Sequence, residues 1–271
     1  MSSPDPVEAR LRARLRELGR CAIALSGGVD SSVVAALAAE ELGENALALT
    51  GVSASLDEGE LEAIREFCAA RDIAHVLVPT EELASPSYRA NEPDRCYHCK
   101  SELYDRLAHA AERHDVRIIV DGTHTGDLSG HRPGLAAARE RGVVSPLVDV
   151  AATKEDVRRI AHRLALQNAA RPAQPCLSSR IAYGVSVTEE RLMQVGEAER
   201  RMKALGFPSV RVRLHQETRG YIARVEVPRD RLVDACALAR EVGDALKPLG
   251  FAWVTLDLEG LRSGSLLEVL R

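Results

Sequence analysis

A glycine-rich turn near the start of the chain is the feature that most limits its fold. Residues 21–25, Cys-Ala-Ile-Ala-Leu, form a short apolar run typical of a buried strand, and residues 33–42 have the apolar spacing of a helix. Between them stand residues 26–32, Ser-Gly-Gly-Val-Asp-Ser-Ser. Glycine lets the backbone approach an anion closely, and the amides at a helix start attract it. The segment therefore predicts a strand, a phosphate-binding loop and a helix in succession.

This loop carries no lysine after its second glycine, so it is not the Walker loop of enzymes that transfer a terminal phosphoryl group. It resembles the PP-loop of ATP pyrophosphatases, which hold pyrophosphate as the leaving group while a substrate oxygen attacks the α-phosphorus. An ordinary glycine turn capped by serine is the alternative. Backbone amides, hydroxyls and a carboxylate that can orient Mg²⁺ on ATP make up the predicted site: Ser26, Gly27, Gly28, Asp30, Ser31 and Ser32.

Strand and helix patterns alternate along the first 170 residues. The predicted strands are 21–25, 46–50, 75–78 and 117–120, and the predicted helices are 6–19, 33–42, 61–68, 99–114, 135–140 and 153–166. Such alternation predicts an α/β fold with a doubly wound parallel sheet. The ligand site of such a sheet lies at the carboxyl ends of its strands.

A proline-rich stretch at 171–175 marks the predicted boundary between two domains. We expect a nucleotide-binding domain at 1–170 and a smaller α+β domain at 171–271. The elements predicted for the second domain are helices 188–205 and 231–246 and strands 210–214, 221–227 and 253–258. Leu-Gly-Phe at 205–207 and again at 249–251 closes a helix and opens a strand, which indicates a weak internal repeat.

Two further loops follow predicted strands and so belong at the ligand edge of the sheet. Gly122 and Thr123 end the strand at 117–120, and we expect them at the nucleotide. Ser53 follows the strand at 46–50 and is a candidate contact for adenine or ribose. An ordinary turn is equally compatible with either segment.

Three of the six cysteines stand outside apolar stripes. Cys96 and Cys99 form a Cys-Tyr-His-Cys pair at a predicted helix start, where the helix dipole and basic neighbours favour thiolates. Such a pair indicates zinc, a redox dithiol or an iron–sulfur cluster. Cys176 lies in a proline-flanked loop, and three thiolates leave one position of a four-ligand site open. The other three lie in apolar patterns and are predicted core residues: Cys21, Cys68 and Cys236.

Composition narrows the classes of partner. Lys and Arg total 36 against 40 Asp and Glu, a net charge of -4, and aromatic residues make up only 3%. The chain therefore lacks the positive field of a nucleic-acid binder and the aromatic residues of a base-stacking surface. No apolar stretch approaches the roughly 18 to 20 residues that cross a bilayer, and the first twenty residues lack a signal-peptide core. We expect a cytoplasmic protein whose partners include neither nucleic acid nor membrane.

Several motifs together resemble the LarE family over nearly the whole chain. They lie at 26–32, 95–104, 121–123, 132–134, 145–147, 175–180, 211–213 and 260–265. LarE proteins are ATP-dependent sulfur transferases that help to build the nickel-pincer nucleotide cofactor of lactate racemase. The resemblance implies that carboxylates of pyridinium-3,5-biscarboxylic acid mononucleotide are adenylylated and become thiocarboxylates. It also implies ATP and Mg²⁺ as cofactors, a sulfur donor as partner, and a homo-oligomer such as a hexamer. The domain at 171–271 would then serve substrate binding, sulfur transfer and oligomerisation.

The family has two sources of sulfur. In some members one loop cysteine gives up its own sulfur and ends as dehydroalanine, and in others three cysteines hold a 4Fe-4S cluster that carries a hydrosulfide. Cys176 matches the essential cysteine of both types. The presence of Cys96 and Cys99 favours the cluster type in this chain.

Basic residues complete the implied site. Arg211 and Arg213 alternate on a predicted strand, so both point to one face, where they would clamp the phosphate or carboxylates of the substrate. Two solvated strand arginines are the alternative. Arg180 and Lys100 would neutralise charge on the leaving AMP.

Acidic residues match the family less closely. Glu199 and Asp230 lie near positions linked to a divalent metal in LarE proteins. The family often has Asp-Gly-Thr-Asn followed by two acidic residues, whereas this chain has His124, Gly126 and Asp127. The resemblance therefore assigns no role to residues 124–127.

Three other functions share some of these features. A tRNA thiolase also pairs a PP-loop with three cysteines, but the net negative charge and the lack of a recognisable RNA-binding appendage disfavour it. A synthetase that makes an amide or NAD from glutamine or ammonia leaves the cysteines unexplained. A nucleotide-sensing module would bind ATP without releasing pyrophosphate.

Overall fold

The computed structural model describes residues 5–129, 132–171, 174–262 and 264–270, and these fold as two compact units. The first unit comprises the chain up to Glu82 and Cys96–Gln174; the second comprises Leu83–Arg95 and the chain from Pro175 onward. Residues 83–95 thus pack with the second unit, although the sequence pattern placed them in the first domain. Parts of two sequence motifs lie outside the described residues, namely Pro172 and Ala173 of the proline-rich boundary and Ser263 near the C-terminus.

The first unit contains the predicted doubly wound sheet. Its four parallel strands run in the order β3 (Ala74–Pro79), β2 (Ala46–Val52), β1 (Cys21–Ala24) and β4 (Ile118–Val120). The chain starts in the centre at β1, proceeds outward through β2 and β3, and then crosses to the other side of β1 to form β4. The topological switch point, where α/β sheets of this kind bind their ligands, therefore lies between β1 and β4.

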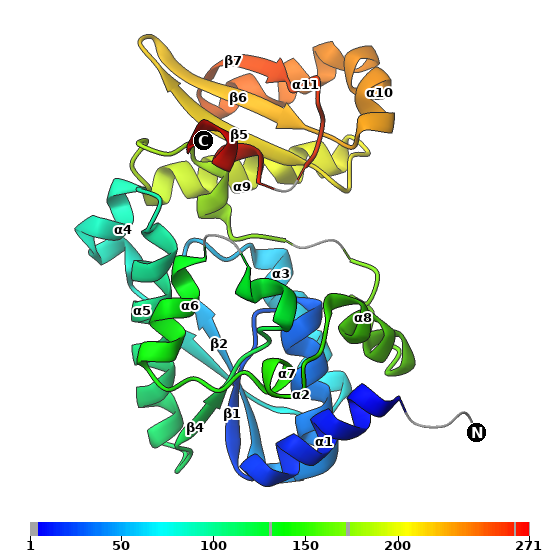
Figure 1. Ribbon diagram of the computed structural model, residues 1–271. Coiled ribbons are helices and arrows are strands. Elements are labelled where there is room, and N and C mark those ends of the chain that lie inside the picture. Colours follow the sequence, from blue (N-terminus) through cyan, green and yellow to red (C-terminus); the bar gives the residue numbers. More distant parts are fainter. Residues whose placement is uncertain (1–4, 130–131, 172–173, 263, 271) are drawn as a thin grey trace. The chain divides into compact units, whose positions relative to one another are not determined.

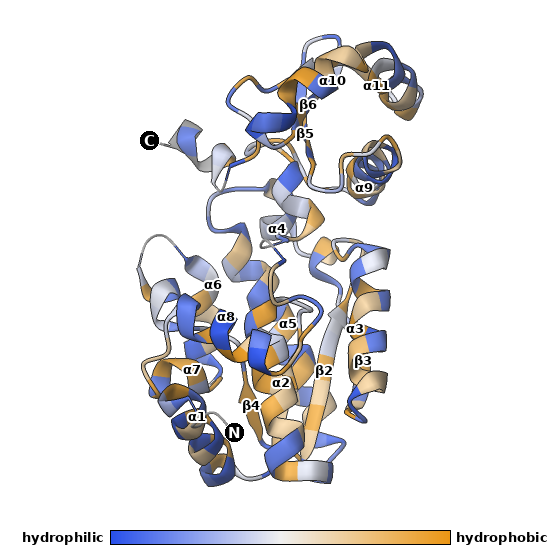
Figure 2. Cartoon of the chain, turned by 90° about the vertical axis from the view of Figure 1, so that its right-hand side faces the viewer, coloured by the Kyte–Doolittle hydropathy of each residue, from blue (hydrophilic) through white to orange (hydrophobic). Residues whose placement is uncertain are grey.

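Helices cover both faces of this sheet (Figure 1). They are α1 (Pro6–Leu18), α2 (Val29–Leu42), α3 (Glu58–Ala70), α5 (Arg95–Glu112), α6 (Pro133–Glu140), α7 (Pro146–Asp149) and α8 (Lys154–Arg163). Cys21 and Ile23 of β1 pack against the helices of one face, and Ala22 packs against α5 and α6 on the other. Because both faces are covered, the strands are mostly apolar, and Figure 2 shows β2 and β4 mainly in the hydrophobic colour.

The second unit pairs a small mixed sheet with helices. Its strands are β5 (Arg211–Glu217), β6 (Gly220–Glu226) and β7 (Phe251–Leu256), with β5 antiparallel and β7 parallel to β6. Its helices are α4 (Pro86–Ala90), α9 (Glu189–Ala204), α10 (Leu232–Ala237) and α11 (Ala239–Leu246). The single helix predicted at 231–246 is thus two short helices.

The predicted repeat has a physical basis in the helix ends. Gly206 and Gly250 both adopt positive φ, +91° and +94°, which a glycine accepts without strain after a helix. The phenylalanine that follows each glycine is buried, Phe207 after α9 and Phe251 at the start of β7. Among the described residues, no helix combines the length and the apolar character needed to cross a membrane.

The end of β4 makes a close backbone contact with the start of α2. A Cβ atom added at Gly122 would lie 2.4 Å from the amide nitrogen of Ser31 and 2.8 Å from the carbonyl carbon of Asp30. Backbone atoms cannot turn aside as a flexible side chain can. Only glycine therefore allows β4 to end beside the first turn of α2.

We predict that Gly122→Ala lowers the free energy of unfolding by about 2 kcal/mol, because overpacking against backbone forces a shift of the strand or the helix. The matched control is Gly243→Ala in α11, where an added Cβ meets nothing within 4 Å and alanine favours the helix. Urea unfolding followed by circular dichroism measures both. Equal stability of the Gly122→Ala variant and the wild type would contradict the contact.

Candidate functional site

The glycine loop forms a cradle of backbone amides at the start of α2. Gly27 has φ +76°, and Gly28 is the N-cap residue of α2. Within the described part of the chain, no side chain bonds to the amides at this cap. The amides of the first helical turn are therefore available to an anion, and the helix dipole favours one. The Ser31 hydroxyl stabilises the turn, since it accepts from the amide of Ser26 at 3.2 Å and donates to the Gly28 carbonyl at 3.1 Å.

Asp30 lies on the first turn of α2 and is paired with a lysine. Lys154 Nζ donates to both Asp30 carboxylate oxygens, at 2.6 and 2.8 Å. Lys154 is the first residue of α8, which a capping box between Thr153 and Asp156 begins. The capping box can be recognised in the sequence because it is local. The pairing of Lys154 with Asp30 cannot, because it joins positions 124 residues apart.

His124, one of three residues at which the sequence departs from the LarE pattern, lies near the same carboxylate. Its Nε2 lies 3.9 Å from Asp30 Oδ1 and 3.5 Å from Asp127 Oδ2. Its Nδ1 accepts a hydrogen bond from the amide of Gly126 at 3.0 Å, so the neutral ring carries its proton on Nε2. Residues 124–127 therefore place a ring nitrogen of His124 near Asp30.

Asp121 fixes the loop that follows β4. This buried carboxylate accepts from the Thr123 amide at 3.0 Å, from the Thr123 hydroxyl at 2.7 Å and from the Ser145 hydroxyl at 2.8 Å. Gly122 lies between these anchored residues and touches the first turn of α2. The structure thus brings Gly122 next to the phosphate loop and holds Thr123 nearby.

Ser53 belongs to a cluster of hydroxyls around a buried carboxylate that the sequence did not reveal. Glu82 accepts from Ser53 at 2.5 Å and from Ser55 at 2.8 Å through one oxygen, and from Thr80 at 2.9 Å through the other. The cluster lies just beyond the ends of β2 and β3, at the ligand edge of the sheet. The only signal in the sequence is a polar residue shortly after a strand end, which is too common to be informative.

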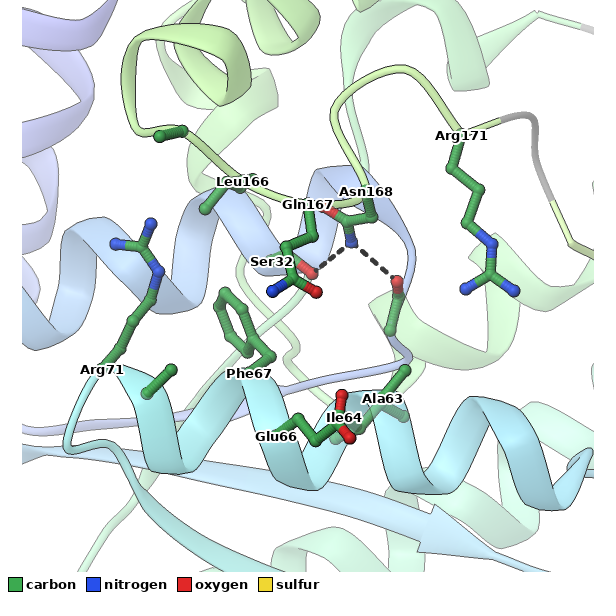
Figure 3. Close-up of a pocket in the computed structure, with 13 residues that line it drawn as sticks. Ser32, Ala63, Ile64, Glu66, Phe67, Arg71, Leu166, Gln167, Asn168 and Arg171 are labelled. Carbon is green, nitrogen blue, oxygen red and sulfur yellow. Dashed lines mark hydrogen bonds between the residues drawn. The ribbon is translucent and has the colours of Figure 1, made fainter.

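A pocket of about 480 Å³ opens beside the phosphate loop (Figure 3). It is lined by the start of α2, the helix α3 and residues 165–171. Asn168 fastens the last of these segments to the loop, because its Nδ2 donates to the Gly27 carbonyl at 2.9 Å and to the Ser32 hydroxyl at 3.0 Å. Ser32, a predicted nucleotide contact, is therefore oriented from outside its own helix.

Cys96 and Cys99 lie on the first turn of α5, as the sequence predicted. Cys96 is exposed and Cys99 is partly exposed. Lys100 Nζ lies 5.5 Å from the centre of the Tyr104 ring, within cation–π range. The N-terminal turn of α6 covers this part of α5, since a Cβ on Gly134 would lie 3.0 Å from Lys100 Cγ.

Cys176 is exposed at the start of a 3₁₀ turn, Leu177–Arg180, in the second unit. Arg180 of this turn is only 2% exposed and makes a two-pronged ion pair with Glu199, at 2.7 and 3.0 Å. Its Nη1 also donates to the Pro175 carbonyl at 2.6 Å. Arg180 was expected to face the leaving AMP, but in this structure its guanidinium is buried and holds the backbone on which Cys176 lies. Glu199, expected near a metal, is the partner in that ion pair.

Arg213 is buried in the same manner. It bonds through two nitrogens to the fully buried Glu226, at 3.1 and 2.9 Å, and Nη1 donates to the Ser179 carbonyl at 2.6 Å. Arg211, two residues earlier on β5, donates to the carbonyl of Arg262 at 3.1 Å. Burial, together with the charges of Arg213 and Arg180, lowers the pKa of Arg211. Of the two predicted clamp residues, Arg213 is committed to the protein interior, whereas Arg211 keeps partial exposure.

The remaining cysteines divide between core and surface. Cys21 and Cys68 are buried as predicted, and burial raises the pKa of each thiol to about 11. Cys236 was predicted to be a core residue and is exposed, because α10 is so short that it buries only Ala235. Asp230 is also exposed, in the turn that precedes α10.

The predicted metal ligands belong to different units: Cys96 and Cys99 to the first and Cys176 to the second. Over the ranges that the structure describes, no three side chains of His, Cys, Asp or Glu form a group that could hold a metal ion. None of the six cysteines is in a disulfide, so all three predicted ligands are thiols with at least partial exposure. Their chemistry suits a cluster, and their assembly stays a prediction.

Comparison with known proteins relates the whole chain to others. A family model described as asparagine synthase matches residues 5–122. An uncharacterized Synechocystis sp. protein is 45% identical, covering 96% of both chains. The pyridinium-3,5-bisthiocarboxylic acid mononucleotide synthase of Lactiplantibacillus plantarum is 36% identical, covering 97% of this chain and 94% of its own. A glutamine-hydrolyzing GMP synthase chain of Archaeoglobus fulgidus is 27% identical over 70% of this chain and 66% of its own.

We predict that Asn168→Ala raises the Kd for ATP by up to about thirtyfold, since it removes two hydrogen bonds to the phosphate loop that contribute about 1 kcal/mol each. Titration calorimetry with ATP and Mg²⁺ measures the change. The control is Gln167→Ala, which alters an exposed neighbour in the same pocket wall. If both variants bind ATP as the wild type does, Asn168 does not order the loop.

Proposed function

Because this chain belongs to the LarE family, we propose that it uses ATP to convert the carboxylates of pyridinium-3,5-biscarboxylic acid mononucleotide into thiocarboxylates. The observation that carries the proposal is the phosphate loop, whose first-turn amides lie at the switch point of the sheet beside Gly122. A PP-loop predicts release of pyrophosphate, and exposed cysteines supply the sulfur chemistry that an amide-forming synthetase does not need. The homo-oligomer that the resemblance implies stays a prediction.

The first step activates the carboxylate. One of its oxygens attacks the α-phosphorus of ATP, the bond from that phosphorus to the bridging oxygen of pyrophosphate breaks, and pyrophosphate leaves with the electron pair. The amides of the loop and the hydroxyls of Ser31 and Ser32 bind the leaving group in this proposal, which requires the Ser31 hydroxyl to turn from the Gly28 carbonyl to a phosphate oxygen. Asp30 orients Mg²⁺ in this proposal, which requires Lys154 to turn from the carboxylate to a phosphate oxygen.

Activation must come first because a carboxylate is a poor acyl donor. Its leaving group would be oxide, whereas AMP leaves readily from the acyl-adenylate. Sulfur then attacks the carbonyl carbon and displaces AMP. We propose that Arg211 binds the phosphate or carboxylates of the substrate and that Lys100 neutralises charge on the departing AMP. Arg180 and Arg213, which are buried, position the Cys176 loop instead.

We propose that Cys96, Cys99 and Cys176 hold a 4Fe-4S cluster. When bound, the cluster would supply the sulfur that displaces AMP. Support comes from the donor set, since three accessible thiols leave one iron without a protein ligand. The alternative is that Cys176 gives up its own sulfur and becomes dehydroalanine.

The activity is tested with the full-length chain after anaerobic reconstitution with iron and sulfide. We expect the wild type to release pyrophosphate from ATP when the biscarboxylate mononucleotide is present, and to form a thiocarboxylate product. Cys176→Ala should still release pyrophosphate but form at most about a hundredth of the product, since it retains the phosphate loop and loses the thiol that both sulfur routes require. Cys236→Ala is the control and should match the wild type. A wild type that releases no pyrophosphate with this substrate contradicts the proposed function.

Iron and sulfide counts on the same proteins test the source of the sulfur. We predict that Cys96→Ala loses most of the bound iron, because two thiolates do not retain a cluster that three hold. Cys236→Ala should keep the iron of the wild type. Equal iron in Cys96→Ala and wild type would exclude the three-thiolate site. Loss of sulfur from Cys176 after one turnover, seen by mass spectrometry, would establish the sacrificial route instead.

A further inference from the structure

The segment Leu83–Arg95 interrupts the sequence of the first unit and packs in the second. Its helix α4 begins with a capping bond from Ser85 and ends at Asn91, which adopts the left-handed conformation with φ 58°. Three of its side chains are buried: Tyr88, Asn91 and Arg95. None of the three has a part in the proposed chemistry, yet all three bond to the loop that carries Cys176.

Ser178, two residues after Cys176, is held from two sides. The hydroxyl of Tyr88 shares a hydrogen bond with the Ser178 hydroxyl at 2.5 Å. The guanidinium of Arg95 donates from Nη1 to the Ser178 carbonyl at 2.9 Å. Ser178 itself is fully buried, so water does not compete for either bond.

Asn91 holds the stretch that follows. Its Nδ2 donates toward the carbonyls of Ala182 and Val185, both at 2.8 Å, and that of Ile181 at 3.3 Å. Its Oδ1 accepts from Arg95 Nη1, so the two side chains orient each other. One amide and one guanidinium thus bind the loop backbone on both sides of residue 180.

Arg95 also has a special place in the chain. It is the last residue of the segment, and Cys96 follows it directly. Its acceptor, Ser178, stands two residues after Cys176. A buried hydrogen bond therefore joins the last residue of the inserted segment to the loop that carries Cys176, within the second unit.

We infer that Arg95, oriented by Asn91 and assisted by Tyr88, is a positioning residue that fixes the backbone of residues 176–185 and with it the direction of the Cys176 thiol. This inference rests on the proposed function, in which Cys176 of this loop takes part in sulfur transfer. Arg180 and Arg213 hold the Pro175 and Ser179 carbonyls from within the C-terminal part of the chain. Arg95 adds the contact at Ser178 from the inserted segment.

Four variants of the full-length chain test the inference. Arg95→Met removes the donor and keeps the length of the side chain; Arg95→Lys keeps the charge but not the fork that reaches two acceptors. Tyr88→Phe removes only the hydroxyl that meets Ser178. The control is Arg89→Met, which changes an exposed arginine on the same short helix.

Hydrogen exchange gives a readout that does not depend on activity. We expect amides of residues 176–185 to exchange about tenfold faster in Arg95→Met, the factor that corresponds to one lost charge-assisted hydrogen bond. The increase should be smaller in Arg95→Lys and Tyr88→Phe and absent in Arg89→Met. Exchange in α9 and β6 should stay as in the wild type, which separates a loosened loop from general unfolding.

Single-turnover kinetics adds the functional readout. The rate of pyrophosphate release should stay within twofold of the wild type in all four variants, while thiocarboxylate formation falls about tenfold in Arg95→Met and recovers in part in Arg95→Lys. Unchanged exchange in residues 176–185 of Arg95→Met overturns the inference, whatever the activity. If Arg95→Met does not fold, the same comparison is made with Arg95→Lys and Tyr88→Phe. A wild type without sulfur transfer refutes the proposed function, and the exchange data still decide whether Arg95 orders the loop.

Discussion

The contact between Gly122 and the first turn of α2 is the constraint on which the nucleotide half of the molecule depends. Two parallel strands, β1 and β4, end side by side, and each must turn without colliding with the other. Within the described residues, the amides at the start of α2 have no side-chain partner at the cap, and the Asp121 carboxylate holds Thr123 and Ser145 in the loops beside β4. A phosphate site therefore follows from how the strands terminate, before any charged side chain is considered.

Buried carboxylates serve the loops of both units. Asp121 and Glu82 each collect hydroxyl donors at the ligand edge of the sheet, whereas Glu199 and Glu226 each neutralise a buried arginine that in turn grips backbone of the Cys176 loop. A carboxylate taken out of water is costly unless donors surround it. Removing any of these donors would thus leave a buried carboxylate without a compensating hydrogen bond, which costs stability. The hydrogen bonds therefore hold these loops in one conformation.

The regular elements were predictable because their signals are local. The strands of the first unit and its long helices follow from apolar runs, helical spacing and the capping box of α8, and the phosphate loop follows from two glycines between a strand and a helix. The long-range pairings were not predictable in this way. Lys154 with Asp30, Glu82 with Ser53 and Arg95 with Ser178 join positions that no periodicity relates.

Buried charge is where the sequence misleads most. Arg180 was expected at the leaving AMP, and Arg213 was expected to clamp the substrate because it alternates with Arg211 on a strand and matches a LarE motif. Their partners, Glu199 and Glu226, carry no pattern that sets them apart from surface glutamates. Cys236 shows the opposite error, since a four-residue spacing from Leu232 indicated a helical stripe that α10 is too short to form.

The discontinuity of the two units has a consequence for how the chain can be cut. A fragment that stops at residue 174 keeps the insertion at 83–95 but discards the loop that Tyr88, Asn91 and Arg95 bind, so three buried polar groups lose partners at once. A fragment that starts at residue 175 lacks those groups altogether. A fusion, permutation or swap between relatives should therefore carry residues 83–95 together with the C-terminal portion.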